Sequence, residues 1–348
     1  MVDWSLARQV ARLAAGADEP VGQAPDLRAL CSEMEAHVAS YTGLVLVTPA
    51  PEPEAVTRAE WTAVNLQALS RLLDPVSQRL DAKLEFAGPL AGALRMGASA
   101  TLAAEAGLVM GYVSQRVLGQ YEVSLLGGDA PPRLLFVAQN LRKAVREMDV
   151  KAEPFQRWIC AHELTHVYQF QGVPWLRDHL SGMIRTYLKT VEVRVERGGA
   201  GLPSLPSAAR LVEMWRDGGL AALVQTQEQR RLMERMQGAM AVIEGYSEHV
   251  MDAIAAQSIP DHARLRAAMD ARRRSRSAPE RLIERLLGLN IKLQQYELGK
   301  SFCDAVADAI GIEGLNRVWE APDALPTAAE LERPDGWLER TQSRPRAA

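Results

Sequence analysis

The chain has 348 residues, of which 47% are hydrophobic and 24% are charged, and its formal net charge is −3. This length is enough to bury a large core, and the composition is that of an ordinary globular protein. The small net charge gives no electrostatic reason to expect nucleic acid or an anionic membrane as a partner.

The first predicted element is a helix that runs from an N-cap at Asp3 to about Ala15. The proline-rich stretch Thr48–Ala55 cannot continue a helix, so we interpret it as a connector. A second amphipathic helix is predicted from about Thr57 to Leu73.

An Ala- and Gly-rich apolar run follows from Phe86 to Val113. It is the part of the sequence that most resembles a membrane span, but Arg95 and Glu105 interrupt it. Small residues also let the helices of soluble proteins pack closely. We therefore predict a packed segment and no contact with a membrane.

Two strands and a long helix are predicted in the middle of the chain. The strands are Tyr121–Leu126 and Arg133–Asn140, and the turn-rich loop between them indicates a small hairpin or a sheet edge. The helix covers Ala152–Gln171, with Pro154 in its first turn and Gly172 as its C-terminal cap.

The later part of the chain contains a Pro- and Gly-containing connection at 196–207 and further helices from about Ala208. The basic run Asp270–Arg281 is predicted to be a solvated loop, and binding of an anionic substrate or partner is the alternative.

The sequence shows no internal repeat and no clear domain boundary. We therefore predict a single domain over residues 1–340, with an N-terminal helical region over about 1–85. Residues 341–348 are predicted to be a disordered tail.

The cysteines and the N-terminus bear on the compartment. The sparse, odd set Cys31, Cys160 and Cys303 fits a reducing cytoplasm better than a disulfide framework. The N-terminus lacks the charged-then-apolar order of a signal peptide. We expect a cytoplasmic protein.

The stretch AHELTHVYQFQ contains the pattern HExxH. His162 and His166 are four residues apart, so on a helix both imidazoles can face one ion. Glu163 lies about 100° around the helix from His162, where it can hold a metal-activated water without acting as a ligand. The alternative is a helix whose histidines only form hydrogen bonds inside the protein.

A catalytic zinc site needs a third protein ligand. The downstream segment VIEGYSEHVMDAI is an apolar helix with acids at Glu244 and Glu248, which share a face. His249 lies about 140° from Glu244, so both cannot easily reach one metal. Both glutamates stay open as ligands at this point, and a salt-bridged surface helix is the alternative.

Several segments together resemble a family of bacterial zincin-like hydrolases whose members are labelled zinc-dependent metalloproteases or proteins associated with deazaflavin-coenzyme biosynthesis. The resemblance runs from Asp3 to about Trp337 and is carried by RAEWTAVN, GYVSQRVLGQY, PFQRWICAHELTHVYQFQGVPWLRDHL, EGYSEHVMDAI and LLGLNIKLQQYELGKSFCDAVADAIGIEGLNRVWEAPDALPT.

This resemblance implies a mainly helical (α+β), zincin-like metalloprotease fold with a small sheet. It also implies one zinc ion held by His162, His166 and Glu244, with Glu163 as general base. Glu244 resembles the downstream glutamate ligand of thermolysin-like zincins. Glu248 stands where those enzymes have an aspartate, and this departure keeps Glu248 as the alternative ligand.

An oxyanion formed during amide hydrolysis needs a donor besides zinc. The candidates are Tyr168, Tyr246, His249 and Tyr296, and spacing does not distinguish them. Each of them could equally occupy a hydrogen-bonded core position.

These observations predict a zinc-dependent hydrolase, a metallopeptidase that cleaves a peptide or amide bond. The first alternative is a zinc amidase that acts on a small metabolite. The second is a catalytically silent zincin-fold binding or scaffold protein. The sequence gives neither the substrate nor the oligomeric state.

Overall fold

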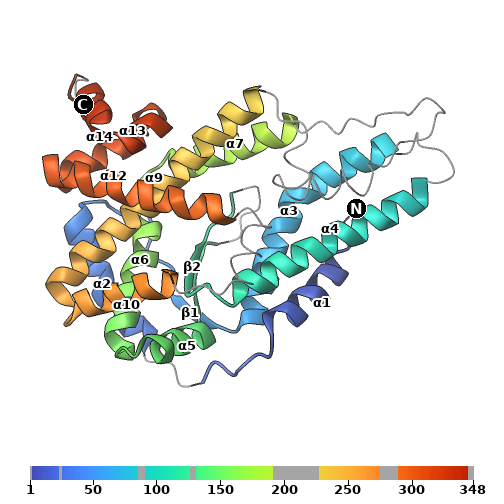
Figure 1. Cartoon of the computed structure of the whole chain (residues 1–348), viewed down its shortest axis with the longest axis horizontal. Coiled ribbons are helices and arrows are strands. Elements are labelled where there is room, and N and C mark those ends of the chain that lie inside the picture. Colours follow the sequence, from blue (N-terminus) through green and yellow to red (C-terminus); the bar gives the residue numbers. More distant parts are fainter. Residues whose placement is uncertain are drawn as a thin grey trace.

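The computed structural model describes residues 2–22, 26–84, 91–125, 131–190, 227–274 and 289–343. These residues form twelve α-helices and a small three-stranded sheet (Figure 1), which confirms the predicted mainly helical class. The α-helices are α1 Trp4–Ala15, α2 Leu27–Thr42, α3 Arg58–Leu84, α4 Ala91–Ser114, α5 Ala138–Met148, α6 Ala152–Gly172, α7 Leu176–Thr190, α9 Gln227–Ser258, α10 His262–Arg274, α12 Leu289–Leu315, α13 Ala328–Glu332 and α14 Pro334–Gln342. Two short 3₁₀ helices, η3 Asn316–Trp319 and η4 Pro322–Ala324, follow α12.

The sheet has the strand order β1-β3-β2, so β3 (Arg133–Val137) is central. β2 (Gly119–Glu122) pairs antiparallel with β3, as the sequence predicts, although it begins two residues before the expected start. The predicted second strand is too long, because its last three residues form the first turn of α5. Asn140 on that turn is buried and donates to the carbonyls of Ser114 and Val117.

β1 (Pro53–Val56) was not expected, since the sequence predicts a connector at Thr48–Ala55. β1 pairs parallel with β3 at the edge of the sheet. Pro53 is its first residue, a position at which a strand tolerates the missing N–H group. The proline content of this stretch therefore did not predict the strand.

Helices α1, α3 and α4 pack together on the right-hand side of Figure 1. The predicted start of α1 is confirmed, since the Asp3 carboxylate accepts from the N–H groups of Ser5 and Leu6. Glycines bring α4 against α1: a Cβ on Gly107 would lie 2.5 Å from the Ala7 carbonyl oxygen. No helix among the described residues combines the length and apolarity that a membrane span requires.

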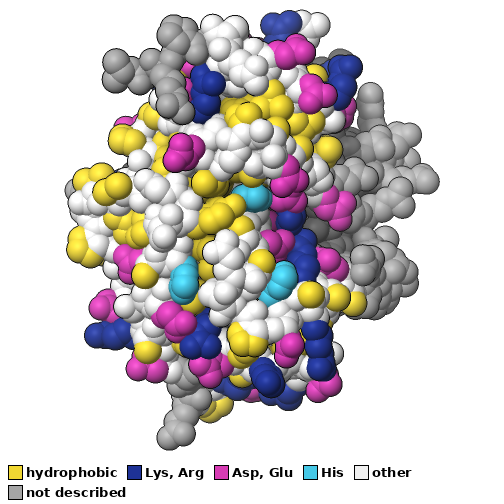
Figure 2. Space-filling model, turned by 90° about the vertical axis from the view of Figure 1, so that its left-hand side faces the viewer, with side chains coloured by type: hydrophobic (Ala, Val, Ile, Leu, Met, Phe, Trp, Pro, Cys, Tyr) yellow, Lys and Arg dark blue, Asp and Glu magenta, His cyan; other side chains and the backbone are white. Residues whose placement is uncertain are grey.

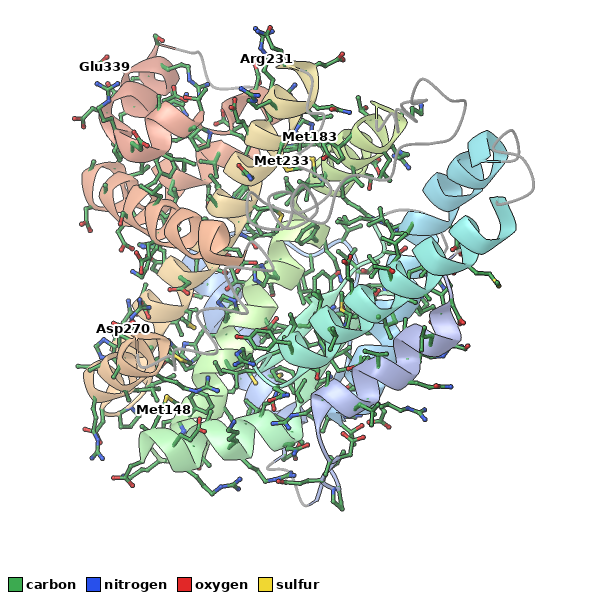
Figure 3. All side chains as sticks on the ribbon, turned by 45° about the vertical axis from the view of Figure 1, so that its right-hand side comes forward. Met148, Met183, Arg231, Met233, Asp270 and Glu339 are labelled. Atoms are coloured by element: carbon green, nitrogen blue, oxygen red, sulfur yellow. The ribbon has the colours of Figure 1, made fainter. Side chains whose placement is uncertain are left out.

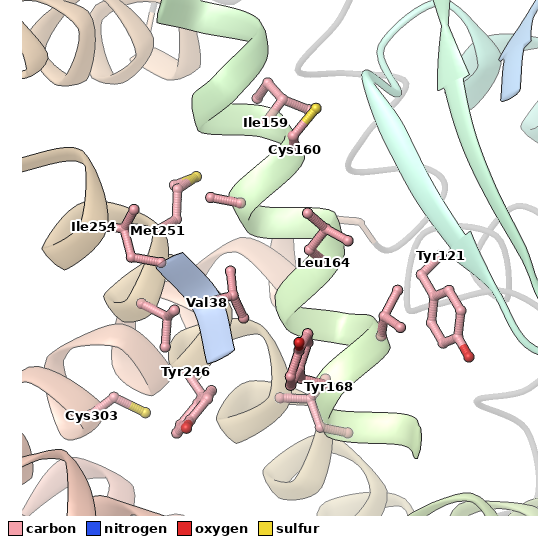
Figure 4. Close-up of a cluster of buried hydrophobic side chains, with 14 of the residues drawn as sticks. Val38, Tyr121, Ile159, Cys160, Leu164, Tyr168, Tyr246, Met251, Ile254 and Cys303 are labelled. Carbon is pink, nitrogen blue, oxygen red and sulfur yellow. The ribbon is translucent and has the colours of Figure 1, made fainter. Parts of the chain in front are cut away.

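The main core lies around α6, which packs between α2 and α9 (Figure 4). α12 covers the other side of α9 at a close approach of two glycines, Gly245 and Gly299. A Cβ on Gly299 would lie 1.9 Å from the Ala241 carbonyl oxygen. This contact fixes the turn of α9 that carries Glu244.

Other predictions have mixed outcomes. α6 begins and ends close to the predicted bounds, but Gly172 is its last helical residue and Val173 is the cap. The basic run was predicted to be a loop, whereas its first part, Asp270–Arg274, is the last turn of α10. The connection at 196–207 and the start near Ala208 lie outside the described residues.

The C-terminal part of the chain is packed as far as the structure describes it. α14 extends to Gln342 and buries Thr341, so the predicted tail does not begin at 341. The division into one domain with an N-terminal helical region stays a prediction, although α2 packs on α6 while α1 and α3 pack on α4.

The three cysteines are buried free thiols. Cys31 of α2 and Cys160 of α6 are far apart in the sequence, yet their sulfur atoms lie 2.9 Å apart. This contact joins the two helices inside the core.

Candidate metal centre

Helix α6 brings the two histidines of the HExxH pattern to one side. The ring centroids of His162 and His166 are 4.8 Å apart, and the ring planes are nearly perpendicular at 87°. Residues on either side of the motif anchor the helix, since Trp158, Ile159 and Leu164 are buried in the main core. The two imidazoles are therefore held on a rigid element rather than on a loop.

Glu244 on α9 faces both imidazoles. One of its carboxylate oxygens lies 3.9 Å from Nε2 of His162 and 3.7 Å from Nε2 of His166. The three ligand atoms lie within 4.8 Å of one another. In a tetrahedral zinc site, ligand atoms at normal bond lengths are about 3.4 Å apart. The two distances from the carboxylate to the imidazoles are close to this spacing, and two imidazoles with a carboxylate are a ligand set that zinc takes.

Gln169 orients one of the ligands. Its Oε1 lies 2.9 Å from Nδ1 of His166, and its Nε2 donates to the carbonyl of Ile243 on α9 over 2.9 Å. Because the amide oxygen can only accept, Nδ1 of His166 carries the proton and Nε2 has the lone pair that a metal needs. Gln169 is fully buried, and it connects α6 to the residue next to Glu244.

Glu163 is buried beside the histidines, with 6% of its surface exposed. Its carboxylate accepts from the backbone N–H of Tyr121 on β2 at 3.1 Å. Burial, and then the nearby charge of Glu244, raise the pKa of Glu163 to about 8, although the Tyr121 hydrogen bond opposes this shift. A group with this pKa can take up and release a proton near neutral pH.

β2 approaches Glu163 closely because Gly119 has no side chain. A Cβ at this position would lie 2.6 Å from Cγ and 2.7 Å from Oε1 of Glu163. The φ angle of Gly119 is not in the left-handed region, so the glycine is needed for space and not for backbone conformation. Gly119 and Tyr121 together fix the position of the carboxylate.

A cavity of about 760 Å³ opens beside His162 and Glu163. Its walls come from α5, α6 and α10, from the turn after α4 and from the start of β2. The volume suits a small molecule or a few residues of a peptide. The candidate metal centre is therefore accessible to a ligand.

The structure separates the two glutamates of α9. Glu248 is buried and its carboxylate lies 3.3 Å from Arg266, away from the two metal-facing histidines. His249 points to other partners, since its ring nitrogens lie 2.8 Å from the Tyr41 hydroxyl and 2.8 Å from the Asp304 carboxylate.

Two of the tyrosines proposed as oxyanion donors, Tyr246 and Tyr168, are not brought to the site. Tyr246 is fully buried, and its hydroxyl donates to Asn316 at 2.7 Å. Tyr168 lies in the main core (Figure 4). The side chain of Tyr296 lies outside the described residues.

Sequence reasoning missed Gln169 and Gly119. Gln169 follows His166 by three residues, so helical periodicity could have placed both on one face. Gly119 comes from a strand that is remote in the sequence, and no local pattern connects it with Glu163.

Three comparisons place the chain among known proteins. The sequence model described as zincin-like metallopeptidase matches residues 2–338. None of the curated proteins matches the chain. A crystal structure from Chloroflexus aurantiacus, described as a candidate hydrolase with a novel fold, is similar over 99% of this chain and 100% of its own, with 28% identity and a TM-score of 0.70.

Proposed function

The chain belongs to the zincin-like metallopeptidase family, and from this premise we propose that it is a zinc-dependent hydrolase that cleaves a peptide or amide bond. The observation that carries the proposal is the meeting of His162, His166 and Glu244 next to the buried carboxylate of Glu163. A zinc ligand set alone could be structural. A carboxylate held beside it, at the wall of a cavity, is what hydrolysis requires.

His162, His166 and Glu244 would hold one zinc ion. When bound, zinc lowers the pKa of water and polarises a carbonyl oxygen. Glu163 takes the proton from the attacking water and delivers it to the leaving amine. The N–H of Tyr121 orients this carboxylate, and the walls around it exclude most of the solvent.

The same arrangement bears on the alternatives. A silent scaffold has no use for Glu163, and burying a carboxylate without a role costs stability. The buried Glu163 therefore favours an enzyme. A zinc amidase that acts on a small metabolite would use the same residues, and the choice between the two substrates stays a prediction, as does the cytoplasmic location.

The test is the paired measurement of zinc content and turnover in Glu163→Gln. Glutamine keeps the size of the side chain but cannot accept the proton, so we expect turnover of a quenched peptide library to fall by about 10²–10⁴. Zinc content, measured by elemental analysis, should stay at the wild-type level because no ligand is removed.

Glu153→Gln is the matched control. It makes the same chemical change on the same helix, at an exposed position that pairs with Arg157. Its turnover and zinc content should equal those of the wild type. Equal turnover of Glu163→Gln and the wild type would contradict the proposed mechanism.

A further inference from the structure

Two of the three buried thiols meet where two helices pack. Cys31 lies on α2 and Cys160 on α6, 129 residues apart in the sequence, and their sulfur atoms are 2.9 Å apart. Both side chains belong to the main core, with 4% and 0% of their surfaces exposed. Hydrophobic packing explains why two cysteines are buried, but it does not require their sulfur atoms to meet.

The distance between the two sulfur atoms lies between that of an ordinary contact and that of a bond. Nonbonded carbon atoms in a protein interior lie about 3.5–4.0 Å apart, and sulfur is the larger atom. A disulfide bond is about 2.05 Å long. The sulfur atoms of Cys31 and Cys160 therefore need to approach by about 0.9 Å to form a bond, and small rotations of the two side chains supply this movement.

Both thiols are carried by packed helices and not by loops. α2 begins at a capped N-terminus, where the Asp26 carboxylate accepts from the Ala29 N–H, and it packs along α6. On α6, Trp158 and Ile159 precede Cys160 and are buried. A reaction between two groups that the fold already holds in contact is fast, because neither has to be brought to the other.

Other partners for the two thiols are excluded among the described residues. Cys303 is buried on α12, and Figure 4 shows it well apart from Cys160. The described residues that could hold a metal ion together are His162, His166 and Glu244, and neither cysteine is among them. The pair is therefore not part of a cysteine metal site, and each thiol has the other as the group with which it can form a bond.

We propose that Cys31 and Cys160 form an intramolecular disulfide when the protein meets a peroxide, and that this bond fastens α2 to the helix of the HExxH motif. One sulfur attacks a peroxide oxygen and becomes a sulfenic acid, and water leaves. The second sulfur then attacks the sulfenic sulfur, and a second water leaves. The thiols are oxidised and hydrogen peroxide is reduced, so two S–H groups and one peroxide give one S–S bond and two water molecules.

A small neutral oxidant suits this pair better than a large or charged one. The thiols have almost no exposed surface, so oxidised glutathione would need the helices to separate before it reached them. On the face in Figure 2, acidic and basic side chains of the described residues are mixed, so no large area of one sign attracts a charged oxidant. In a reducing compartment the pair stays as thiols, in agreement with the sparse cysteine content. The inference does not depend on the proposed hydrolase function.

The test uses the full-length protein, as purified with its metal and freed of reductant. The protein is treated with a small excess of hydrogen peroxide, denatured, alkylated with N-ethylmaleimide and digested without reduction. We expect a linked pair of peptides that contain Cys31 and Cys160, while Cys303 is alkylated as in the untreated protein. The unfolding temperature of the treated protein should rise by about 5 °C, because the bond joins residues that are 129 positions apart.

Peroxide also oxidises methionines, such as the partly exposed Met148 and Met233, which Figure 3 labels. Dithiothreitol separates the two reactions, since it reduces a disulfide and leaves a methionine sulfoxide unchanged. It should therefore cancel the rise in unfolding temperature and remove the linked peptides.

Cys31→Ala should abolish the rise, and Cys303→Ala, which removes another buried thiol, is the matched control and should keep it. The peptide map of the unsubstituted protein tests the bond without any variant. Three alkylated cysteines after treatment, a link to Cys303 or to a second chain, or a sulfinic acid in place of the link would overturn the proposal. A link without a rise in unfolding temperature, or a rise that persists in Cys31→Ala, would equally overturn the claim that the bond fastens α2 to α6.

Discussion

Helix α9 contributes to two groups of acidic and histidine side chains, through Glu244 and, five residues later, through His249, and the groups differ in how their polar atoms are used. At Glu244, one carboxylate oxygen faces two Nε2 atoms at 3.7 and 3.9 Å, beyond the distance of a hydrogen bond. At His249, both ring nitrogens make hydrogen bonds of 2.8 Å, to Tyr41 and to Asp304. The first group has the spacing of metal ligands, and the second is a closed hydrogen-bond network.

The second group continues through several charged residues. Lys300 donates to Asp304 at 2.6 Å and lies 3.3 Å from Asp252, which in turn accepts from Arg266 at 2.8 Å. Every acid in this network has a cation beside it. The comparison teaches that residue type alone does not identify a metal site. What identifies it is the distance between the ligand atoms and the absence of a cationic side chain already paired with the acid.

The largest expected effect is the loss of zinc from the first group, which tests directly whether the two groups differ. His166→Ala or His162→Ala removes one of three protein ligands, so zinc affinity should fall by more than about 100-fold and turnover should reach background, since loss of an outer partner alone costs about 10–100-fold. His249→Ala is the control on α9 and should keep zinc at the wild-type level. Elemental analysis decides between them, and full zinc occupancy in either ligand variant would show that the assignment is wrong.

The next effect concerns the carboxylate and not the metal. In Gly119→Ala the new Cβ would lie 2.6 Å from Glu163, so the carboxylate must move away from its place beside Tyr121. We expect turnover to fall by about 10² because general-base catalysis depends on position. Zinc content should not change. Gly97→Ala, where the added Cβ meets no atom within 4 Å, is the control.

A smaller effect on zinc affinity is expected from the residue that orients one ligand of the first group. Gln169→Leu removes the acceptor at Nδ1 of His166 and the link to the Ile243 carbonyl. Zinc affinity should fall by about 10–100-fold, as for other outer partners of metal ligands. Competition with a chromogenic chelator measures it. Gln171→Leu is two residues further along α6, where the side chain bonds Thr48 and the hydroxyl of Tyr121 rather than a metal-facing histidine, and it should leave the zinc affinity unchanged.

The sequence predicted the elements that are determined by residues close together in the chain. The spacing of His162 and His166 on an amphipathic helix and the cap at Asp3 both depend on residues within a turn or two, and the structure has both helices. β1 could not be predicted in this way, since four residues beginning with Pro53 become a strand only through parallel pairing with β3, about eighty residues later.

The candidate site shows the same limit. Glu244 and Glu248 are equivalent by spacing, and only the packing of α9 on α6 turns one towards the histidines and the other towards Arg266. Gly119 and Arg272 reach the cavity from elements that no local pattern connects with the HExxH helix. The residues that complete the site are thus determined by tertiary contacts.

The smallest expected effect is a dependence of stability on pH that belongs to the second group alone. Burial raises the pKa of Asp304, but hydrogen bonds from His249 and Lys300 outweigh it, so the pKa lies below its usual value. Two further titratable groups belong to this network: Tyr41, whose hydroxyl forms a hydrogen bond with His249, and Asp252, which forms an ion pair with Lys300. A depressed pKa in the folded state stabilises the protein above the unfolded value of about 3.9, and this contribution is lost as the pH falls through the folded value.

Asp304→Asn should therefore lower the free energy of unfolding at pH 7 by about 1 kcal/mol, a small figure because water screens a side chain that is 41% exposed. The difference from the wild type should shrink below about pH 4. Urea denaturation at pH 7 and at pH 3.5 measures both values, with Asp149→Asn at an exposed surface pair as the control. A difference that stays constant between the two pH values would show that the Asp304 carboxylate is not stabilised by its charge.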